Sequence, residues 1–214
     1  MKLDKSNMLL YAVTDRRWLN GKILASVVEE ALIGGVTCLQ LREKELDDES
    51  FLAEALEIKK VCHKYGVPFI INDNVDVAIK CGADGIHVGQ SDMNASELRK
   101  YVGDEMIIGV SAATVETALE AVKNGADYIG TGAVFSTSTK NDACDVDKDT
   151  LKRICSSVSV PIVAIGGITK NNICQLKGTG VDGVAVVSAI FAQANIKDST
   201  VELLELSKKM VNEK

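Results

Sequence analysis

Short apolar runs of strand length recur along the chain, and most of them end in a glycine or a polar residue. The runs cover residues 8–15, 36–42, 68–73, 84–89, 106–111, 127–132, 161–167 and 182–188. Segments between them have the apolar spacing of amphipathic helices, most clearly residues 23–35, 48–66, 114–126 and 199–214. Eight alternations of strand and helix predict parallel strands, because a parallel pair needs a crossover connection.

A closed (β/α)8 barrel, the TIM barrel of eight parallel strands with outer helices, fits this order of elements best. The chain has 214 residues and is 46% apolar, which is enough for one substantial core. We therefore expect a single domain over residues 1–214. The alternative is an open sheet of the Rossmann or flavodoxin type. No GxGxxG motif follows the first apolar run, where a dinucleotide-binding sheet of that type would carry it.

Glycine followed two residues later by aspartate precedes three of the predicted strands. The motif occurs at residues 82–84, 125–127 and 180–182. Glycine is typical of the position just after a helix, where the chain often turns left-handed. We interpret these motifs as stop signals between a helix and the next strand.

Charge and cysteine content exclude several classes of partner. The net charge is −6 and the pI is near 5.1, so no broad basic surface is expected to bind nucleic acid or an anionic membrane. The chain has no apolar run of membrane-spanning length and no signal-peptide cleavage site, which predicts a cytoplasmic protein.

Six cysteines without a CxxC pair indicate buried thiols rather than disulfides or a zinc site. The sequence does not predict an oligomeric state.

The second predicted strand ends in QLREK, residues 40–44, where polar side chains alternate with leucines. In a barrel the outer helices cover one side of each strand, so the alternate polar residues face the interior or the rim. Leu39 and Leu41 are expected to face the helices. Gln40 and Arg42 are then expected to face the barrel axis, with Lys44 at the mouth.

Other predicted strands also end in polar residues or glycines, and barrel active sites lie at the carboxyl ends of the strands. These strand ends carry Asn72, Asp73, Gln90, Ser91, Asp92, Ser111, Gly166, Gly167 and Ser188, and the apolar Val187 stands just before the last of them. Glycines after the seventh strand and a serine after the eighth suit a phosphate site, since they allow backbone N–H groups and a hydroxyl to approach an anion. Ordinary turn glycines are the alternative.

Two aspartates at consecutive strand ends, Asp73 and Asp92, suit Mg²⁺, which is often held by one or two carboxylates together with water and substrate phosphate. With Arg42, Lys44 and Lys140 on the same rim, the pattern favours a magnesium diphosphate site. Either aspartate alone would also suit a helix cap. The hydroxyls of residues 137–139 suit a second anionic group, or merely a surface loop.

Seven motifs then carry a family resemblance. They are QLREK (40–44), INDNVDVA (71–78), GADGIHVGQSD (82–92), IIGVSA (107–112), GAVFSTSTK (132–140), PIVAIGGI (161–168) and GVAVVSAI (183–190). In this order, and over nearly the whole chain, the sequence resembles thiamine phosphate synthase. The resemblance implies a magnesium-dependent transferase that condenses 4-amino-2-methyl-5-(diphosphooxymethyl)pyrimidine with a carboxylated thiazole phosphate. It releases diphosphate and CO₂, through a pyrimidine cation.

The resemblance also implies roles for individual residues. Contacts to the pyrimidine diphosphate are expected from Gln40, Leu41, Arg42, Glu43, Lys44, Asn72, Ser111 and Lys140. Contacts to the thiazole phosphate are expected from Thr137, Ser138, Thr139, Gly167, Val187 and Ser188. The expected Mg²⁺ ligands are Asp73 and Asp92. No protein nucleophile is needed, and His63 and His87 are interpreted as structural.

One departure and three alternatives accompany this interpretation. The family loop often has prolines where Ala133 and Ser136 stand here, so the loop is expected to be less restricted and its closure to cost more entropy. A thiazole tautomerase would not need a magnesium site. A Schiff-base aldolase would use Lys44 or Lys140. A non-catalytic sensor of thiamine precursors would bind both substrates and release no diphosphate.

Overall fold

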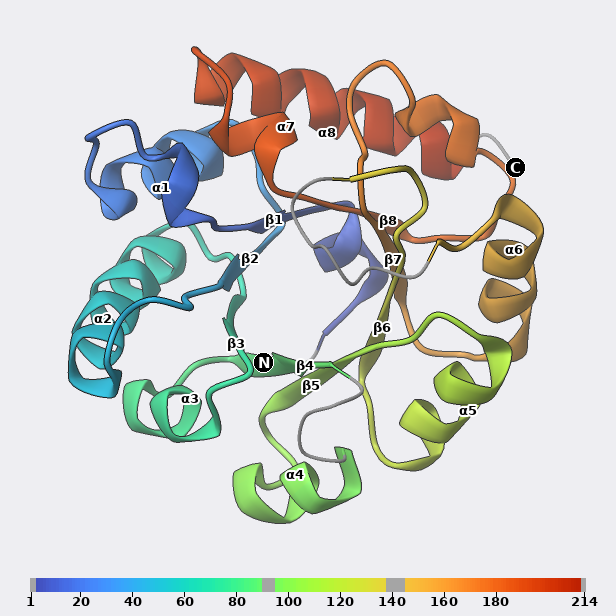
Figure 1. Cartoon of the computed structure of the whole chain (residues 1–214), viewed down its shortest axis with the longest axis horizontal. Helices are drawn as coiled ribbons and strands as arrows, with labels where there is room; N and C mark the ends of the chain where they lie inside the picture. Colours follow the sequence, from blue (N-terminus) through green and yellow to red (C-terminus); the bar gives the residue numbers. More distant parts are fainter. Residues whose placement is uncertain (1–2, 90–94, 138–144, 213–214) are drawn as a thin grey trace.

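The computed structural model describes residues 3–89, 95–137 and 145–212. Eight parallel strands pair in sequence order, and the last pairs with the first to close the barrel (Figure 1). The strands are β1 Leu10–Val13, β2 Cys38–Leu41, β3 Phe69–Asn72, β4 Gly85–Val88, β5 Ile107–Ser111, β6 Tyr128–Thr131, β7 Ile162–Ile165 and β8 Gly183–Val186. The predicted TIM barrel is confirmed, and the open sheet is excluded.

Helices surround the barrel as its outer layer (Figure 1). They are α1 Leu24–Ile33, α2 Asp48–Lys64, α3 Val75–Cys81, α4 Ala95–Val102, α5 Val115–Lys123, α6 Lys148–Ser157, α7 Ser188–Phe191 and α8 Ile196–Asn212, with the 3₁₀ helices η1 Lys5–Met8, η2 Arg16–Trp18 and η3 Ile173–Leu176. Side-chain caps from Asp47, Thr114 and Asp147 begin α2, α5 and α6. Between β7 and β8 only the short η3 forms. Residues 166–180 are rich in glycine, asparagine and threonine, which are poor helix formers.

Alternation along each strand divides the apolar side chains into two layers. Leu39 and Leu41 belong to the outer layer between strands and helices, as predicted, and both are fully buried. The inner layer fills the lumen. It consists of Met8, Tyr11, Val13, Cys38, Ile70, Ile107, Tyr128, Val163 and Ala185. Both layers together form the core, and each fully buried large apolar side chain contributes about 1.5–3 kcal/mol.

At the amino ends of the strands, a side chain before each even-numbered strand accepts a hydrogen bond from the N–H of the first or second residue of the preceding strand. The pairs are Thr37 with Leu10, Asp84 with Phe69, Asp127 with Ile108 and Asp182 with Ile162. The aspartate of the Gly-x-Asp motif therefore joins neighbouring strands. Gly82, the first of these glycines, ends α3 in the left-handed region with φ 62°, as the stop-signal interpretation requires.

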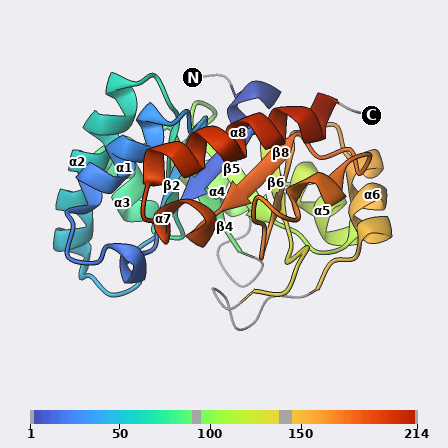
Figure 2. The same cartoon turned by 90° about the horizontal axis from the view of Figure 1, so that it is seen from above.

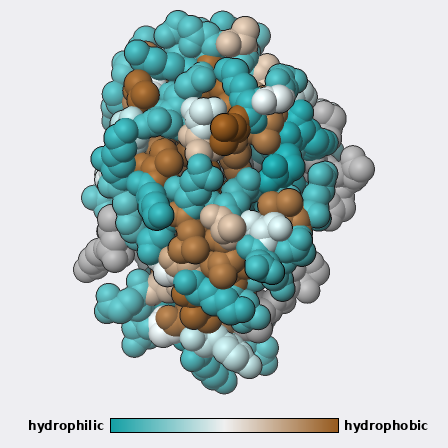
Figure 3. Space-filling view, turned by 90° about the vertical axis from the view of Figure 1, so that its left-hand side faces the viewer, coloured by the Kyte–Doolittle hydropathy of each residue, from teal (hydrophilic) through white to brown (hydrophobic). Residues whose placement is uncertain are grey.

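The amino end of the barrel is closed by η1, which contributes the buried Met8 to the lumen. Figure 2 shows η1 and the end of α8 on the same side of the molecule. Figure 3 shows apolar surface over the side formed by α1, α2 and α3, where Ile23, Ile33, Leu56 and Ile79 are exposed. None of the helices in the described ranges is both long and apolar enough to span a bilayer.

The described cysteines agree with the interpretation as thiols. Cys38, Cys62 and Cys81 are buried and free, and burial raises the pKa of each thiol. Cys155 is half-buried, and Cys174 is an exposed exception. Cys144 lies outside the described residues.

Candidate active site

The first two side chains of the QLREK segment face the directions that the alternation predicts. Gln40 is 5% exposed, and its Nε2 donates a hydrogen bond to Tyr11 Oη in the lumen at 2.9 Å. Leu41 points into the outer apolar layer, so only its backbone lies at the carboxyl end of β2. The backbone N–H of the half-buried Arg42 donates to Thr14 Oγ1 at 3.0 Å, which fixes the chain as it leaves the strand.

Lys44 and Asp73 meet at the mouth of the barrel. Lys44 Nζ lies 2.5 Å from Asp73 Oδ2, and the two side chains are 51% and 30% exposed. Asp73 has a φ of 63°, a backbone region that non-glycine residues seldom adopt outside turns and functional sites. Its N–H donates to the carbonyl of His87 at 2.9 Å, which holds the turn in place.

Asp73 does not cap the helix that follows it. Asn74 caps α3, because its side-chain oxygen accepts the N–H of Val77 at 2.9 Å. The carboxylate of Asp73 is therefore directed to the rim and its cation instead of to the helix.

Glu43 is the other carboxylate of this segment, and it faces the protein. It is 9% exposed, and its carboxylate accepts hydrogen bonds from the N–H groups of Lys44 and Glu45 and from Nε of Arg16. Burial raises the pKa of Glu43, but these hydrogen bonds outweigh burial and hold it below its ordinary value. Arg16 also pairs with Glu54. Glu43 thus shapes the loop that presents Lys44.

Polar side chains in the lumen form one connected chain. Tyr11 Oη lies 2.8 Å from Tyr128 Oη, which lies 2.9 Å from His87 Nδ1. The other ring nitrogen, His87 Nε2, lies 3.0 Å from Ser111 Oγ. Asn72, 8% exposed, ends β3 opposite His87 in the sheet register.

The two lumen tyrosines, and the hydrogen bonds of His87 to Tyr128 and Ser111, were not predicted. Tyr11 and Tyr128 lie in apolar runs, and only their place in the alternation marks them as lumen-facing. Glycines gave a further signal. A Cβ atom on Gly109 would lie 2.1 Å from Cζ of Tyr128, and one on Gly130 would lie 3.1 Å from Cε1 of His87. Inward-facing glycines in these strands mark the space that the two rings occupy.

The glycines after β7 are required by a close approach of the preceding loop. The N–H of Phe135 donates to the carbonyl of Gly166 at 3.1 Å. Gly167 has a φ of 61°, and a Cβ there would lie 2.3 Å from the carbonyl oxygen of Ser136. The same segment leads to Thr137, the last described residue before the gap. Val187 and Ser188 stand at the start of α7, after β8.

Several predicted site residues lie outside the described ranges. They are Gln90, Ser91, Asp92, Ser138, Thr139 and Lys140. Of the predicted magnesium ligands, Asp73 is described, and its half-exposed carboxylate offers the oxygen donors that Mg²⁺ prefers. Among the described residues no group of three or more His, Cys, Asp or Glu side chains gathers around one point. A magnesium ion held mainly by water and substrate oxygens needs no such group, so Asp73 fits this kind of site.

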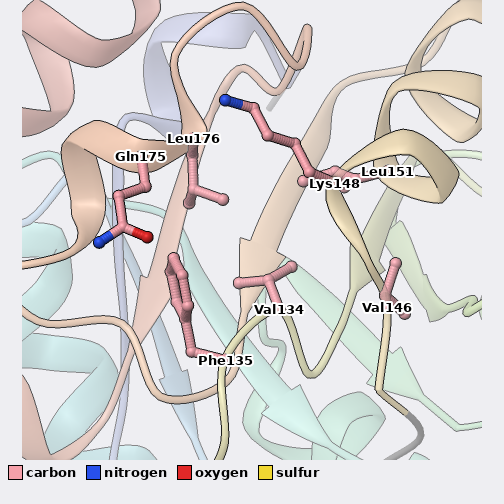
Figure 4. A pocket seen from close by; sticks show the side chains of 7 residues that line it. All are labelled: Val134, Phe135, Val146, Lys148, Leu151, Gln175 and Leu176. Carbon is pink, nitrogen blue, oxygen red and sulfur yellow. The ribbon is translucent and has the colours of Figure 1, made fainter.

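A small pocket lies apart from these residues, between α6 and η3 (Figure 4). It is lined by Val134, Phe135, Val146, Lys148, Leu151, Gln175 and Leu176. Gln175 and Leu176 belong to η3, so the pocket lies where this short 3₁₀ helix stands in place of a full outer helix. None of the predicted substrate contacts lines it, and the candidate site remains the carboxyl end of the barrel.

Comparison with known proteins gives the family. Residues 10–190 match the family described as thiamine monophosphate synthase. The chain belongs to this family. It is 52% identical to the thiamine-phosphate synthase of Ruminiclostridium cellulolyticum, over 95% of this chain and 97% of that protein. It is 48% identical to the thiamine-phosphate synthase of Clostridium botulinum, over 94% of this chain and 95% of that protein.

Among solved structures, the thiamine phosphate pyrophosphorylase from Pyrococcus furiosus superposes with a TM-score of 0.90 at 36% sequence identity. The superposition covers 97% of this chain and 99% of that one. As a member of the thiamine monophosphate synthase family, the chain is an enzyme, a transferase of thiamine biosynthesis that acts on small molecules.

Proposed function

We propose that the chain condenses 4-amino-2-methyl-5-(diphosphooxymethyl)pyrimidine with a carboxylated thiazole phosphate to give thiamine phosphate, diphosphate and CO₂. The observation that carries this proposal is the arrangement at the carboxyl end of β2 and β3. There the charged pair of Lys44 and Asp73 stands at the mouth, and the uncharged Gln40 lies buried in the lumen. The site thus has a charged level at the mouth and an uncharged level in the lumen. A substrate with a charged tail and a polar ring suits this arrangement.

The uncharged level would hold the pyrimidine ring. Gln40, Asn72 and Ser111 lie at or next to the carboxyl ends of their strands and offer an amide, a second amide and a hydroxyl. Buried hydrogen-bonding groups select strongly for a ring that satisfies them, because a ligand that lacks the partner leaves them unpaired.

The charged level would hold the diphosphate. Arg42, Lys44 and Lys140 supply positive charge, and Asp73 and Asp92 would hold Mg²⁺. When bound, Mg²⁺ neutralises charge that develops on the departing diphosphate. These residues would thus favour cleavage of the bond between the exocyclic CH₂ and the diphosphate oxygen, with both electrons leaving on oxygen.

The resulting pyrimidine cation would be captured by the thiazole nitrogen, which forms the new carbon–nitrogen bond with its lone pair. Loss of CO₂ then leaves the electron pair of the broken carbon–carbon bond on the thiazole, which takes up a proton from water to give thiamine phosphate. No protein nucleophile takes part. The thiazole phosphate would be held by residues 137–139, by Gly167 and by the start of α7 at Val187 and Ser188.

The test is to incubate the purified protein with both substrates and to measure diphosphate, thiamine phosphate and CO₂ with and without Mg²⁺. We expect the three products in equal amounts, and only with the metal. Controls omit one substrate at a time. Diphosphate release with no thiamine phosphate, or no turnover under conditions where a known synthase is active, would overturn the proposal.

The same assay separates the alternatives. A tautomerase would change the thiazole when the pyrimidine is omitted. A sensor would bind both substrates, measured by calorimetry, and release no diphosphate. An aldolase would be trapped covalently by borohydride in the presence of a carbonyl substrate.

A further inference from the structure

A chain of hydrogen bonds crosses the lumen beneath the candidate site. Four hydrogen bonds connect Gln40, Tyr11, Tyr128, His87 and Ser111 in this order, at 2.9, 2.8, 2.9 and 3.0 Å. The five side chains come from five different strands, β2, β1, β6, β4 and β5. The first and the last of them are proposed contacts of the pyrimidine ring. The three in the middle have no role in the proposed reaction.

Proton counting gives this chain a direction. Burial raises the pKa of Tyr11 and of Tyr128 well above the ordinary value of 10, so each hydroxyl keeps its single proton at neutral pH. Gln40 Nε2 donates to Tyr11 Oη, and the direction that continues from this donor has the proton of Tyr11 on the side of Tyr128. The proton of Tyr128 is then directed to His87 Nδ1.

The direction continues to the other end. A His87 that accepts at Nδ1 carries its proton on Nε2, and this N–H donates to Ser111 Oγ at 3.0 Å. Ser111 is then an acceptor within the chain and directs its own proton to an acceptor outside it. At the opposite end, Gln40 donates an amide N–H to Tyr11, and the amide oxygen Oε1 of Gln40 therefore points away from the tyrosine.

We propose that Tyr11, Tyr128 and His87 are positioning residues that fix Gln40 as an acceptor and Ser111 as a donor for the aminopyrimidine ring. An aminopyrimidine presents N–H donors on its exocyclic amine and lone pairs on its ring nitrogens, which is the complementary set. The reverse direction would make Gln40 the donor and Ser111 the acceptor, and the ring would then have to bind in the opposite orientation. This role rests on the proposed function. The histidine tautomer that the role requires can be tested independently of that function.

Packing leaves the chain little freedom to rearrange. The ring centroids of Tyr11 and Tyr128 are 5.9 Å apart, and those of His87 and Tyr128 are 5.5 Å apart. The ring of Tyr128 lies against Gly109, where any side chain would collide with it. A tyrosine hydroxyl removed from this chain therefore leaves its neighbours without a partner at a fixed position.

The tautomer is tested first, by nitrogen NMR without any substrate. The chain has two histidines, so protein labelled with ¹⁵N-histidine gives signals from His63 and His87 alone. His63→Gln assigns them. We expect His87 to be protonated at Nε2 and unprotonated at Nδ1 at neutral pH, with a changed tautomer ratio in Tyr128→Phe. A wild-type His87 that carries its proton on Nδ1, or on both nitrogens, would overturn the proposal.

The positioning role is tested by kinetics on Tyr11→Phe and Tyr128→Phe. We expect KM for the pyrimidine diphosphate to rise about tenfold, the factor for one buried hydrogen bond, while KM for the thiazole phosphate changes less than about twofold. The matched control is Tyr65→Phe, which removes a hydroxyl that donates to Glu29 on the outside of the barrel at 2.9 Å. It should behave as wild type.

Three outcomes are distinguishable. Equal rises in both KM values would indicate general damage to the barrel and would contradict the proposal. An unchanged pyrimidine KM together with an unchanged His87 tautomer would also contradict it. A wild-type enzyme that is inactive on both substrates would overturn the proposed function alone. If Tyr128→Phe fails to fold, the kinetics of Tyr11→Phe and the His87 tautomer of the wild-type protein still test the proposal.

Discussion

Aspartates with opposite roles lie at the two ends of the barrel. At the amino ends of the strands, Asp84, Asp127 and Asp182 accept backbone N–H groups from neighbouring strands. At the carboxyl ends, Asp73 leaves the capping of α3 to Asn74, and its carboxylate meets Lys44 at a solvent-accessible rim. The same kind of side chain accepts backbone N–H groups at one end and, in Asp73, pairs with a lysine at the other.

Strand direction explains the difference. The amino ends of parallel strands present N–H groups without a strand partner, and a carboxylate satisfies such a donor well. The carboxyl ends present carbonyl groups, which a carboxylate cannot satisfy. Backbone N–H groups at that end belong to the helix that follows each strand, and Asp47 and Asp147 accept them as caps of α2 and α6. Asp73 leaves this role to Asn74 and pairs with Lys44, and in a barrel the cations at this rim also suit a phosphorylated substrate.

The sharpest test of this comparison is Asp73→Asn. Asparagine tolerates the φ of 63° at this position about as well as aspartate, so the free energy of unfolding should change by less than about 1 kcal/mol. Removing the charge should lower kcat/KM by about a hundredfold or more, since a charge partner of the diphosphate site is lost. Initial rates at several Mg²⁺ concentrations and urea denaturation measure the two effects. A stable variant with full activity would contradict the assignment.

Asp127→Ala tests the opposite end. Asp127 accepts the N–H of Ile108 at 2.7 Å and pairs with Arg99 at 2.6 Å. Its loss should lower the free energy of unfolding by about 2 kcal/mol, because a backbone donor and a cation lose their acceptor. We expect kcat/KM to stay within about twofold of wild type in the folded protein. Lost turnover with unchanged stability would show that the two ends are not separated in this way.

Glu43→Gln sharpens the comparison, because this carboxylate lies at the carboxyl end of the barrel but accepts hydrogen bonds from the protein itself. Its pKa lies below the ordinary value of 4.5, so its ionised form stabilises the fold at higher pH, and this contribution is lost as pH falls below that value. The variant should lose about 1 kcal/mol at neutral pH and show a flatter decline in acid. Denaturation curves at several pH values measure this. Glu45→Gln, on an exposed neighbour, is the control, and an equal effect there would refute the specific role.

Much of the rim was predictable from the sequence. Alternation in QLREK correctly directed Gln40 to the lumen and Leu41 to the helices, because the helices cover only one side of each strand. The structural role of Glu43 and the cap by Asn74 were not predictable. Both depend on which backbone N–H groups a loop brings near the side chain, and the order of residues does not specify this.

The sequence by itself determined the eight strands, their parallel order and the family, since these follow from local periodicity and from motifs in a fixed order. Only the tertiary structure decided how the lumen is connected. Tyr11 and Tyr128 are 117 positions apart and meet because the barrel closes, with β1 beside β8. The alternation of a strand shows which way a side chain faces, but closure of the barrel determines which side chain it meets there.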